Sequence, residues 1–148
     1  MTTGQIVIRP ATGGGSFVGV SVSGGENTDV TTDTTLYITA VATDWLTGSD
    51  FSVGDQDITI AAAGYYIVQW TVNVDCTVAC RFSTGVGGTF AVGGQDQVRI
   101  AIPDTNGYYV NASAIIQTTA ANQTVNLYAA VSTGTGHVIV TSFSVTKV

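Results

Sequence analysis

Few residues of this chain could do chemistry, and their spacing assembles no catalytic group. His137 is the only histidine, and it follows Gly134-Thr135-Gly136. One histidine cannot build a multi-histidine metal site, and no serine or cysteine nucleophile motif stands beside it in the sequence. We therefore expect His137 to be a loop or strand-end residue without a chemical role.

Cys76 and Cys80 are the only cysteines. On one straight strand their Cα atoms would lie about 13 Å apart, beyond the reach of a disulfide. If the chain turns between them, they face each other across a hairpin and could form a bridge. Both fall on an apolar register, where a free cysteine packs as a small hydrophobe. We expect two buried thiols. A disulfide is the first alternative, and metal or redox chemistry is the second.

The acidic residues are scattered. Asp55-Gln56-Asp57 offers oxygen ligands to a calcium ion but lacks the spacing of an EF-hand, so we expect a solvated loop. No spacing selects a pair of carboxylates for glycoside hydrolysis. Gly85-Val86-Gly87-Gly88 lacks the lysine and the helix of a phosphate-binding loop. The sequence predicts a protein that is not an enzyme and binds no cofactor or metal.

Length and charge restrict the partners of the chain. Its 148 residues are enough for one domain with a full core. It has 4 Lys and Arg against 10 Asp and Glu, with a net charge of −6. So few cations cannot neutralise a run of phosphates, which argues against nucleic acid and against an anionic membrane surface. No apolar run approaches the roughly 20 residues of a membrane helix, and we see no secretory signal.

The composition predicts an all-β fold. The chain has 24 Thr, 21 Val and 11 Ile, against 3 Leu, 1 Glu and 1 Lys, so β-branched residues replace the good helix formers. The clearest stretch is 66–82, where the even positions from Tyr66 to Phe82 are apolar or cysteine and share one buried face. A single strand of that length would span about 56 Å, too long for one domain. We predict a turn near Asp75–Ala79.

The remaining pattern predicts about ten short antiparallel strands and no helix, as in a sandwich or jelly roll. Gly24–Asp33 is predicted to be a polar loop, and Trp45–Gly48 a turn. Further strands are expected at Phe17–Val22, Thr34–Thr43, Ile58–Ile60, Gln97–Ile102, Tyr108–Gln117, Thr124–Ser132 and His137–Val148.

Residues 1–15 are expected to be an N-terminal arm ahead of a domain over 16–148. A short apolar run ends at Arg9-Pro10, and Gly13-Gly14-Gly15 follows as a hinge. The segment could pair with a sheet edge of a neighbour, although a disordered tail or an ordinary first strand remain alternatives. The expected contact residues of the arm are Gln5, Ile6, Val7, Ile8 and Arg9.

Several segments resemble the jelly rolls of the tumour-necrosis-factor and complement globular-head superfamily. The stretch from Ile58 to Val68 holds an apolar residue and a short linker, Ala61-Ala62-Ala63, ahead of Gly-x-Tyr and a long core strand. Ala112–Gln117, Thr124–Tyr128 and Val140–Val145 look like that family's last three strands, and Phe17–Val20 like its first. The resemblance spans roughly 17–148 and implies a ten-strand jelly roll that forms a compact homotrimer.

The aromatic residues give separate support for a trimer. Consecutive residues of a strand point to opposite faces, so one ring each of Tyr65-Tyr66 and Tyr108-Tyr109 must face outward. An outward aromatic face with few charges suits a subunit interface, and half-exposed surface tyrosines are the alternative. The expected interface residues are Tyr65, Tyr66, Trp70, Tyr109, Tyr128 and Phe143.

These features lead to a hypothesis of assembly and not of catalysis. We expect a trimeric phage head-decoration (cement) protein on the exterior of the virion, whose partners are its own copies and the major capsid protein. The alternative is the receptor-binding tip of a phage tail or head fibre, which would present Gly24–Asp33 or Gly85–Gly94 to its ligand. A hydrolase on a jelly-roll scaffold is the least favoured function.

Overall fold

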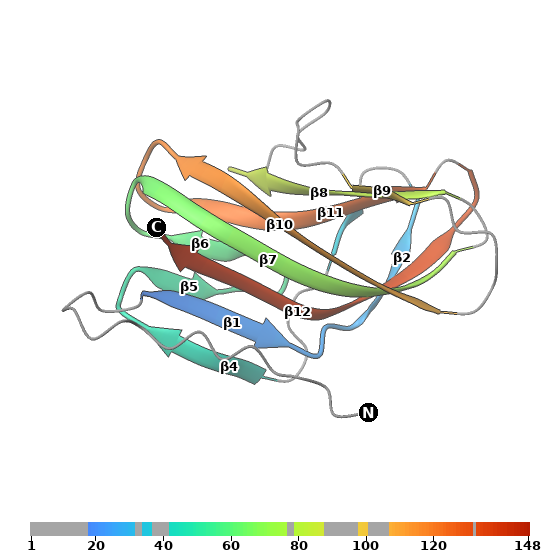
Figure 1. Ribbon diagram of the computed structural model, residues 1–148, viewed down its shortest axis with the longest axis horizontal. Coiled ribbons are helices and arrows are strands. Elements are labelled where there is room, and N and C mark those ends of the chain that lie inside the picture. The colour runs from blue at the N-terminus through green and yellow to red at the C-terminus, as the bar shows by residue number, and fades with distance from the viewer. Residues whose placement is uncertain are drawn as a thin grey trace.

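A computed structural model describes residues 18–31, 34–36, 42–76, 79–87, 98–100, 107–131 and 133–148. These residues form twelve β-strands, and none of them lies in a helix. The strands make two antiparallel six-stranded sheets, one in front of the other in Figure 1. The predictions of an all-β chain and of an antiparallel sandwich are confirmed. No helix in this part of the chain is long and apolar enough to cross a membrane.

The first sheet has the order β10-β7-β12-β1-β4, with β2 also paired to β12. It therefore places the first described strand beside the last one. The strands are β10 (Tyr108–Thr118), β7 (Gly64–Asp75), β12 (Gly136–Lys147), β1 (Gly19–Ser23), β4 (Ala42–Thr47) and β2 (Asn27–Val30).

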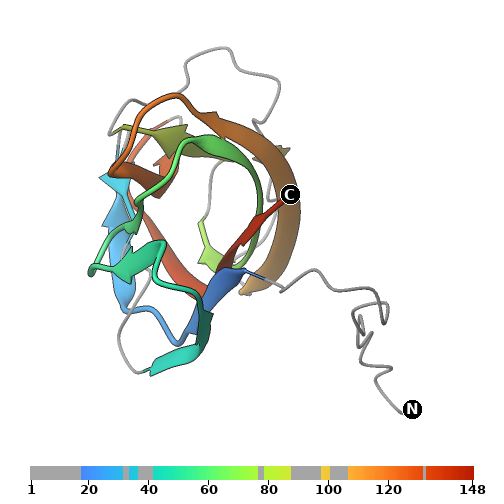
Figure 2. The same ribbon diagram turned by 90° about the vertical axis from the view of Figure 1, so that its left-hand side faces the viewer.

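The second sheet has the order β5-β6-β11-β8-β9, with β3 also paired to β11. Figure 2 shows the two sheets curving around a common interior. The strands are β5 (Phe51–Val53), β6 (Ile58–Ile60), β11 (Gln123–Val131), β8 (Cys80–Val86), β9 (Val98–Ile100) and β3 (Thr34–Thr35).

The long alternating stretch forms one strand in each sheet. β7 ends at Asp75 and β8 begins at Cys80, so the predicted turn is confirmed and carries the chain from one sheet to the other. The apolar residues of both strands face the same interior. The Trp70 ring of β7 meets the Phe82 ring of β8 with 5.5 Å between centroids, a contact that joins the two sheets.

Three local predictions were wrong. The predicted strand Thr34–Thr43 is not one strand, because β3 (Thr34–Thr35) belongs to the second sheet and β4 (Ala42–Thr47) to the first. The predicted loop Gly24–Asp33 contains β2, because its residues from Asn27 to Val30 pair with the start of β12. The predicted turn at Trp45–Gly48 is mostly strand, because β4 continues to Thr47 along β1. In the last two cases a partner far away in the sequence supplies the backbone hydrogen bonds that the local composition did not indicate.

Candidate functional site

Three of the six predicted interface residues, Tyr66, Trp70 and Phe143, lie inside the sandwich of a single chain. Tyr128 is also buried, but on the opposite side of β11 from its core neighbours Leu127 and Ala129. Tyr66 and Phe143 are fully buried, and Trp70 and Tyr128 are 2% and 6% exposed. Trp70 and Phe143 are paired neighbours on the inner face of β7 and β12. These four side chains are largely covered by their own chain and offer little surface to a second copy, so their place in an interface stays a prediction.

Tyr66 shows what its ring does instead. Its hydroxyl donates a hydrogen bond to the Ala62 carbonyl oxygen at 3.0 Å. Its ring meets the Phe51 ring edge to face, and it leaves only 3.4 Å for a Cβ at Gly64. Burial, and then the charge of Asp50, raises the pKa of the Tyr66 hydroxyl. The Gly-x-Tyr motif thus closes the corner that leads into β7.

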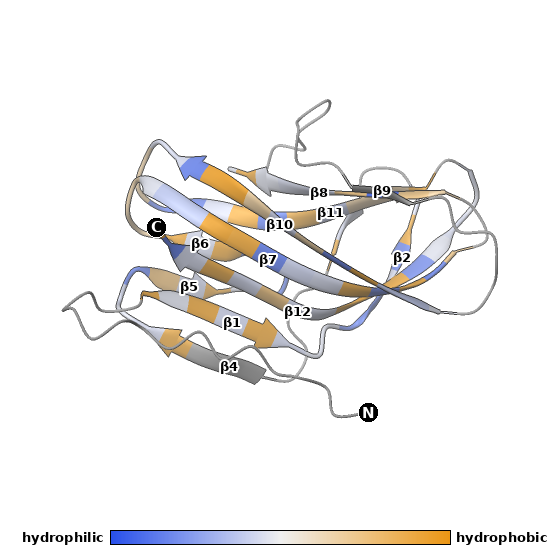
Figure 3. Cartoon of the chain, viewed as in Figure 1, coloured by the Kyte–Doolittle hydropathy of each residue, from blue (hydrophilic) through white to orange (hydrophobic). Residues whose placement is uncertain are grey.

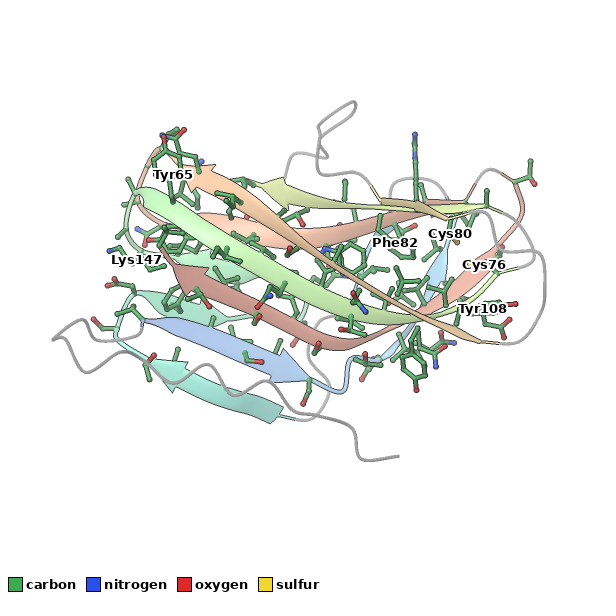
Figure 4. The ribbon with its side chains drawn as sticks, in the orientation of Figure 1. Tyr65, Cys76, Cys80, Phe82, Tyr108 and Lys147 are labelled. Carbon is green, nitrogen blue, oxygen red and sulfur yellow. The ribbon has the colours of Figure 1, made fainter. Side chains whose placement is uncertain are left out.

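Tyr65 and Tyr109 are exposed, as predicted, at 56% and 70%. They border the outer side of the first sheet, where Ile115 is 73% exposed. Tyr109 pairs with Asn73, and Ile115 pairs with Ile67. Figure 4 shows Tyr65 near one end of β7 and Tyr108 at the opposite end of the sheet.

We call the outer side of β10, β7 and β12 the uncharged face. On β7 the outward positions run from Tyr65 to Asn73, and the hydropathy bands that alternate along this strand are visible in Figure 3. Asp75 and His137 mark one end of the face, where they pair across β7 and β12. The uncharged face consists of Tyr65, Ile67, Gln69, Thr71, Asn73, Tyr109, Asn111, Ser113, Ile115, Gln117, Ser142 and Ser144, with no Asp, Glu, Lys or Arg among them.

The uncharged face is hollowed at its centre. The hollow has a volume of about 460 Å³. Ser144 closes one side and donates a weak hydrogen bond to the Gln69 carbonyl oxygen at 3.5 Å. Uncharged polar side chains cost less to bury than charged ones, and a partner can satisfy their hydrogen bonds, so this surface suits contact with another protein surface. The lining residues are Gln69, Trp70, Thr71, Asn111, Ala112, Ser113, Ser142 and Ser144.

His137 lies at the start of β12, as expected, but with a partner that the sequence analysis missed. Its Nδ1 is 2.7 Å from Asp29 Oδ1, across β12 and β2. The two side chains are 50% and 71% exposed, so the pair adds little stability. The residues lie 108 positions apart, and the sequence predicts a loop around Asp29, so no local signal joins them.

A second hollow lies beside this pair. Its volume is about 340 Å³. A Cβ at Gly107 would come within 2.8 Å of Asn73 Oδ1, so the glycine leaves room for the Asn73 amide. The hollow offers amide, carboxylate and imidazole groups at one end of the uncharged face. Its lining residues are Asn27, Asn73, Asp75, Gly107, His137 and Ile139.

The structure also describes the two cysteines and the acidic segment Asp55–Asp57. Cys76 and Cys80 are free, buried thiols, as expected. Asp55-Gln56-Asp57 lies in a turn in which the Gly54 N–H donates to the Asp57 carbonyl oxygen at 2.9 Å. Within the described ranges, no three acidic, histidine or cysteine residues are placed to hold a metal ion. The arm residues Gln5 to Arg9, the boundary of the arm at residue 15, and positions 88–94 of the predicted ligand loop lie outside the described residues.

Comparison with known proteins places the fold. No family model matches the sequence, and no curated protein matches it. Solved structures match by shape. The Eiger TNF of S. frugiperda has a TM-score of 0.64 at 12% identity, over 89% of this chain and 92% of that one. Murine APRIL at pH 5.0 gives 0.63 at 8% identity, over 90% and 100%.

The globular domain of the zebrafish complement 1qA protein gives a TM-score of 0.62 at 10% identity, over 90% of this chain and 98% of that one. At such identities the likeness concerns shape and carries no activity from one chain to another. The resemblance inferred from Gly64-x-Tyr66 and the last three strands is confirmed at the level of fold. The chain has the jelly-roll sandwich fold of the tumour-necrosis-factor and complement globular-head proteins.

Proposed function

We propose that three copies of this chain assemble through the uncharged face into a homotrimer. The chain is acidic, with a net charge of −6, so identical copies repel one another wherever their carboxylates meet. The uncharged face avoids that repulsion, and its margin carries the exposed side chains of Tyr65, Tyr109 and Ile115. Burial of these apolar groups favours association. An uncharged surface with exposed apolar side chains, on an otherwise acidic chain, is the observation that supports the homotrimer.

A closed trimer requires that the uncharged face of one copy meet a different surface of the next copy. The hollow at Gln69 and Ser113 would receive side chains from that neighbouring copy. A permanent interface of this kind buries more than about 2,000 Å². The TNF-like and C1q-like fold supports such an arrangement, because the resemblance to that superfamily implies a compact homotrimer.

The trimer would then have a structural role on a viral head shell and would not act as a catalyst. We propose that it binds the major capsid protein on the exterior of the virion as a decoration protein. Each copy of the trimer would make one weak contact with the shell. Because the three contacts are linked, formation of one raises the effective concentration of the other two, and the overall attachment is strong. Residues 1–15, with Gln5 to Arg9 at their centre, would supply one contact per copy.

Co-sedimentation with purified, undecorated head shells of the virus that encodes the chain tests this role. The full chain should pellet with the shells at a fixed stoichiometry, and a chain that lacks residues 1–15 should keep its oligomeric mass but pellet far less. Failure of the full chain to bind the shells would contradict the decoration role. Undiminished binding of the truncated chain would remove the arm from the mechanism.

A receptor-binding tip is the second candidate, and the hollow beside His137 favours it. Asn27, Asn73 and Asp75 present amide and carboxylate groups that can hydrogen-bond the hydroxyls of a sugar. On a glycan array the chain should then bind a defined class of sugar, Asn73→Ala should abolish that binding, and Asn111→Ala, on the same sheet outside this hollow, should preserve it. An array without a signal would exclude sugar binding.

A further inference from the structure

The corner between the two sheets brings the two cysteines together. Cys76 follows the last residue of β7, Cys80 begins β8, and their Sγ atoms are 2.6 Å apart. Non-bonded heavy atoms usually keep about 3.5–4.0 Å, and an S–S bond measures about 2.05 Å. Figure 4 shows Cys76 and Cys80 near each other at one end of the sandwich. The sulfur atoms therefore need only a small movement to bond.

The surroundings hold the sulfur atoms in place. Cys76 is 1% exposed, and Cys80 is fully buried. A Cβ at Gly136 would collide with Cys76 Sγ and would come within 3.0 Å of a Val131 methyl group, so the start of β12 packs directly on the sulfur. Because both thiols are buried and Cys76 packs against Gly136, the thiol pair has little freedom to move apart.

We infer that Cys76 and Cys80 form a covalent modification site, at which a small-molecule disulfide oxidant closes an intrachain bridge. The thiolate of Cys76 attacks one sulfur of the oxidant and releases one thiol. Cys80 then attacks the Cys76 sulfur of the mixed disulfide and releases the second thiol. The two cysteines lose two electrons and two protons, and the oxidant gains them as two thiols.

The order of attack follows from the hydrogen bonds. The Cys80 thiol donates to Cys76 Sγ, and the backbone N–H of His137 also bonds to that sulfur, so negative charge is better accommodated on Cys76. Burial nevertheless raises the pKa of both thiols. The folded chain should therefore oxidise slowly, through transient opening of the corner, and quickly during refolding.

Intact mass measurement tests this inference on the full chain. The chain is refolded with oxidised glutathione or with a reductant, quenched in acid, and alkylated under denaturing conditions. We expect both cysteines to be alkylated after reduction and neither after oxidation, with no retained glutathione. Alkylation of both cysteines after oxidation, or a stable glutathione adduct on the wild-type chain, would overturn the inference.

Two variants separate the bridge from a structural effect of the cysteines. Cys80→Ala should retain glutathione on Cys76, because no second thiol resolves the mixed disulfide. The bridge should raise the melting temperature of the oxidised wild type by about 5 °C over the reduced form, since it closes only a short loop. Cys76→Ala/Cys80→Ala should melt at one temperature under both conditions. A shift of the same size in that variant would overturn the inference.

Discussion

Tyr65 and Tyr66 are consecutive residues of β7 whose side chains lie on opposite sides of the same sheet. Tyr66 is fully buried in the core of one chain, and Tyr65 is 56% exposed on the uncharged face. The side chain of Tyr66 stabilises the fold, whereas the side chain of Tyr65 is available for contact with another molecule. Mutations on the two sides should therefore affect different measurements.

Two buried threonines should respond to the same substitution with opposite signs. Thr84 is 2% exposed, and its hydroxyl has no hydrogen-bond partner among the described residues. Thr118 is 1% exposed, and its hydroxyl donates to the Ala62 carbonyl oxygen at 3.0 Å. Thr84→Val should raise the free energy of unfolding by about 1 kcal/mol, and Thr118→Val should lower it by about 1 kcal/mol.

Urea unfolding of the two valine variants beside the wild type measures both changes. Each variant serves as the control of the other, because the change in volume and shape is the same. Equal shifts in one direction would show that the hydroxyl environments of Thr84 and Thr118 are not as described.

Gly136→Ala should destabilise the chain by about 1–3 kcal/mol, because the added methyl overpacks the site against Cys76 and Val131. The Cys76→Ala substitution removes the sulfur and should restore part of that loss in the double variant. The difference between the loss in the wild-type background and the loss in the Cys76→Ala background measures the contact. Equal losses in both backgrounds would contradict the close approach of Gly136 and Cys76.

Alkaline pH should destabilise the reduced chain. Burial raises the pKa of the Cys76 and Cys80 thiols in the folded state. In the unfolded chain a thiol has its ordinary pKa of about 8.5. Above that pH the unfolded chain releases protons that the folded chain retains, so the free energy of unfolding falls as the pH rises. The effect is absent well below pH 8.5.

Melting curves from pH 7 to 10 with a non-thiol reductant test this dependence. The reduced wild type should lose more stability over that range than Cys76→Ala/Cys80→Ala, which keeps Tyr66 and every other titrating group. Parallel curves for the two proteins would contradict the burial of the thiols.

Much of the fold could be predicted because its signal is local. The period of two over 66–82 identified the core faces of β7 and β8 and the turn between them, and Gly64-x-Tyr66 indicated the corner. β2 could not be predicted, because its polar residues form a strand only through pairing with β12. Its four residues alternate between exposed and buried positions, but so short a segment gives no sequence signal stronger than its polar composition.

The candidate site was predicted only in part, for a related reason. Alternation showed that one ring of each tyrosine pair must face outward, and Tyr65 and Tyr109 do. It could not show that Trp70 and Phe143 fill the interior of a single chain, because aromatic residues suit a core and an interface equally. The His137–Asp29 contact joins distant strands and needed the three-dimensional structure.

A charge on the uncharged face should separate the copies without unfolding the chain. Ser113 is exposed on β10, beside Gln69, and lines the central hollow. Ser113→Arg would bury a charge in the proposed interface, a cost of several kcal/mol, and should yield a folded monomer. Ser52→Arg is the matched control, because Ser52 is exposed on β5 of the other sheet and should leave the oligomeric mass unchanged. Circular dichroism verifies the fold of both variants.

The mass of the wild-type chain in solution, measured by sedimentation equilibrium at micromolar concentration, tests the central claim most directly. Assembly through the uncharged face predicts a single species with three times the 15.2 kDa of one chain. A stable, soluble species with the mass of one chain would contradict the claim.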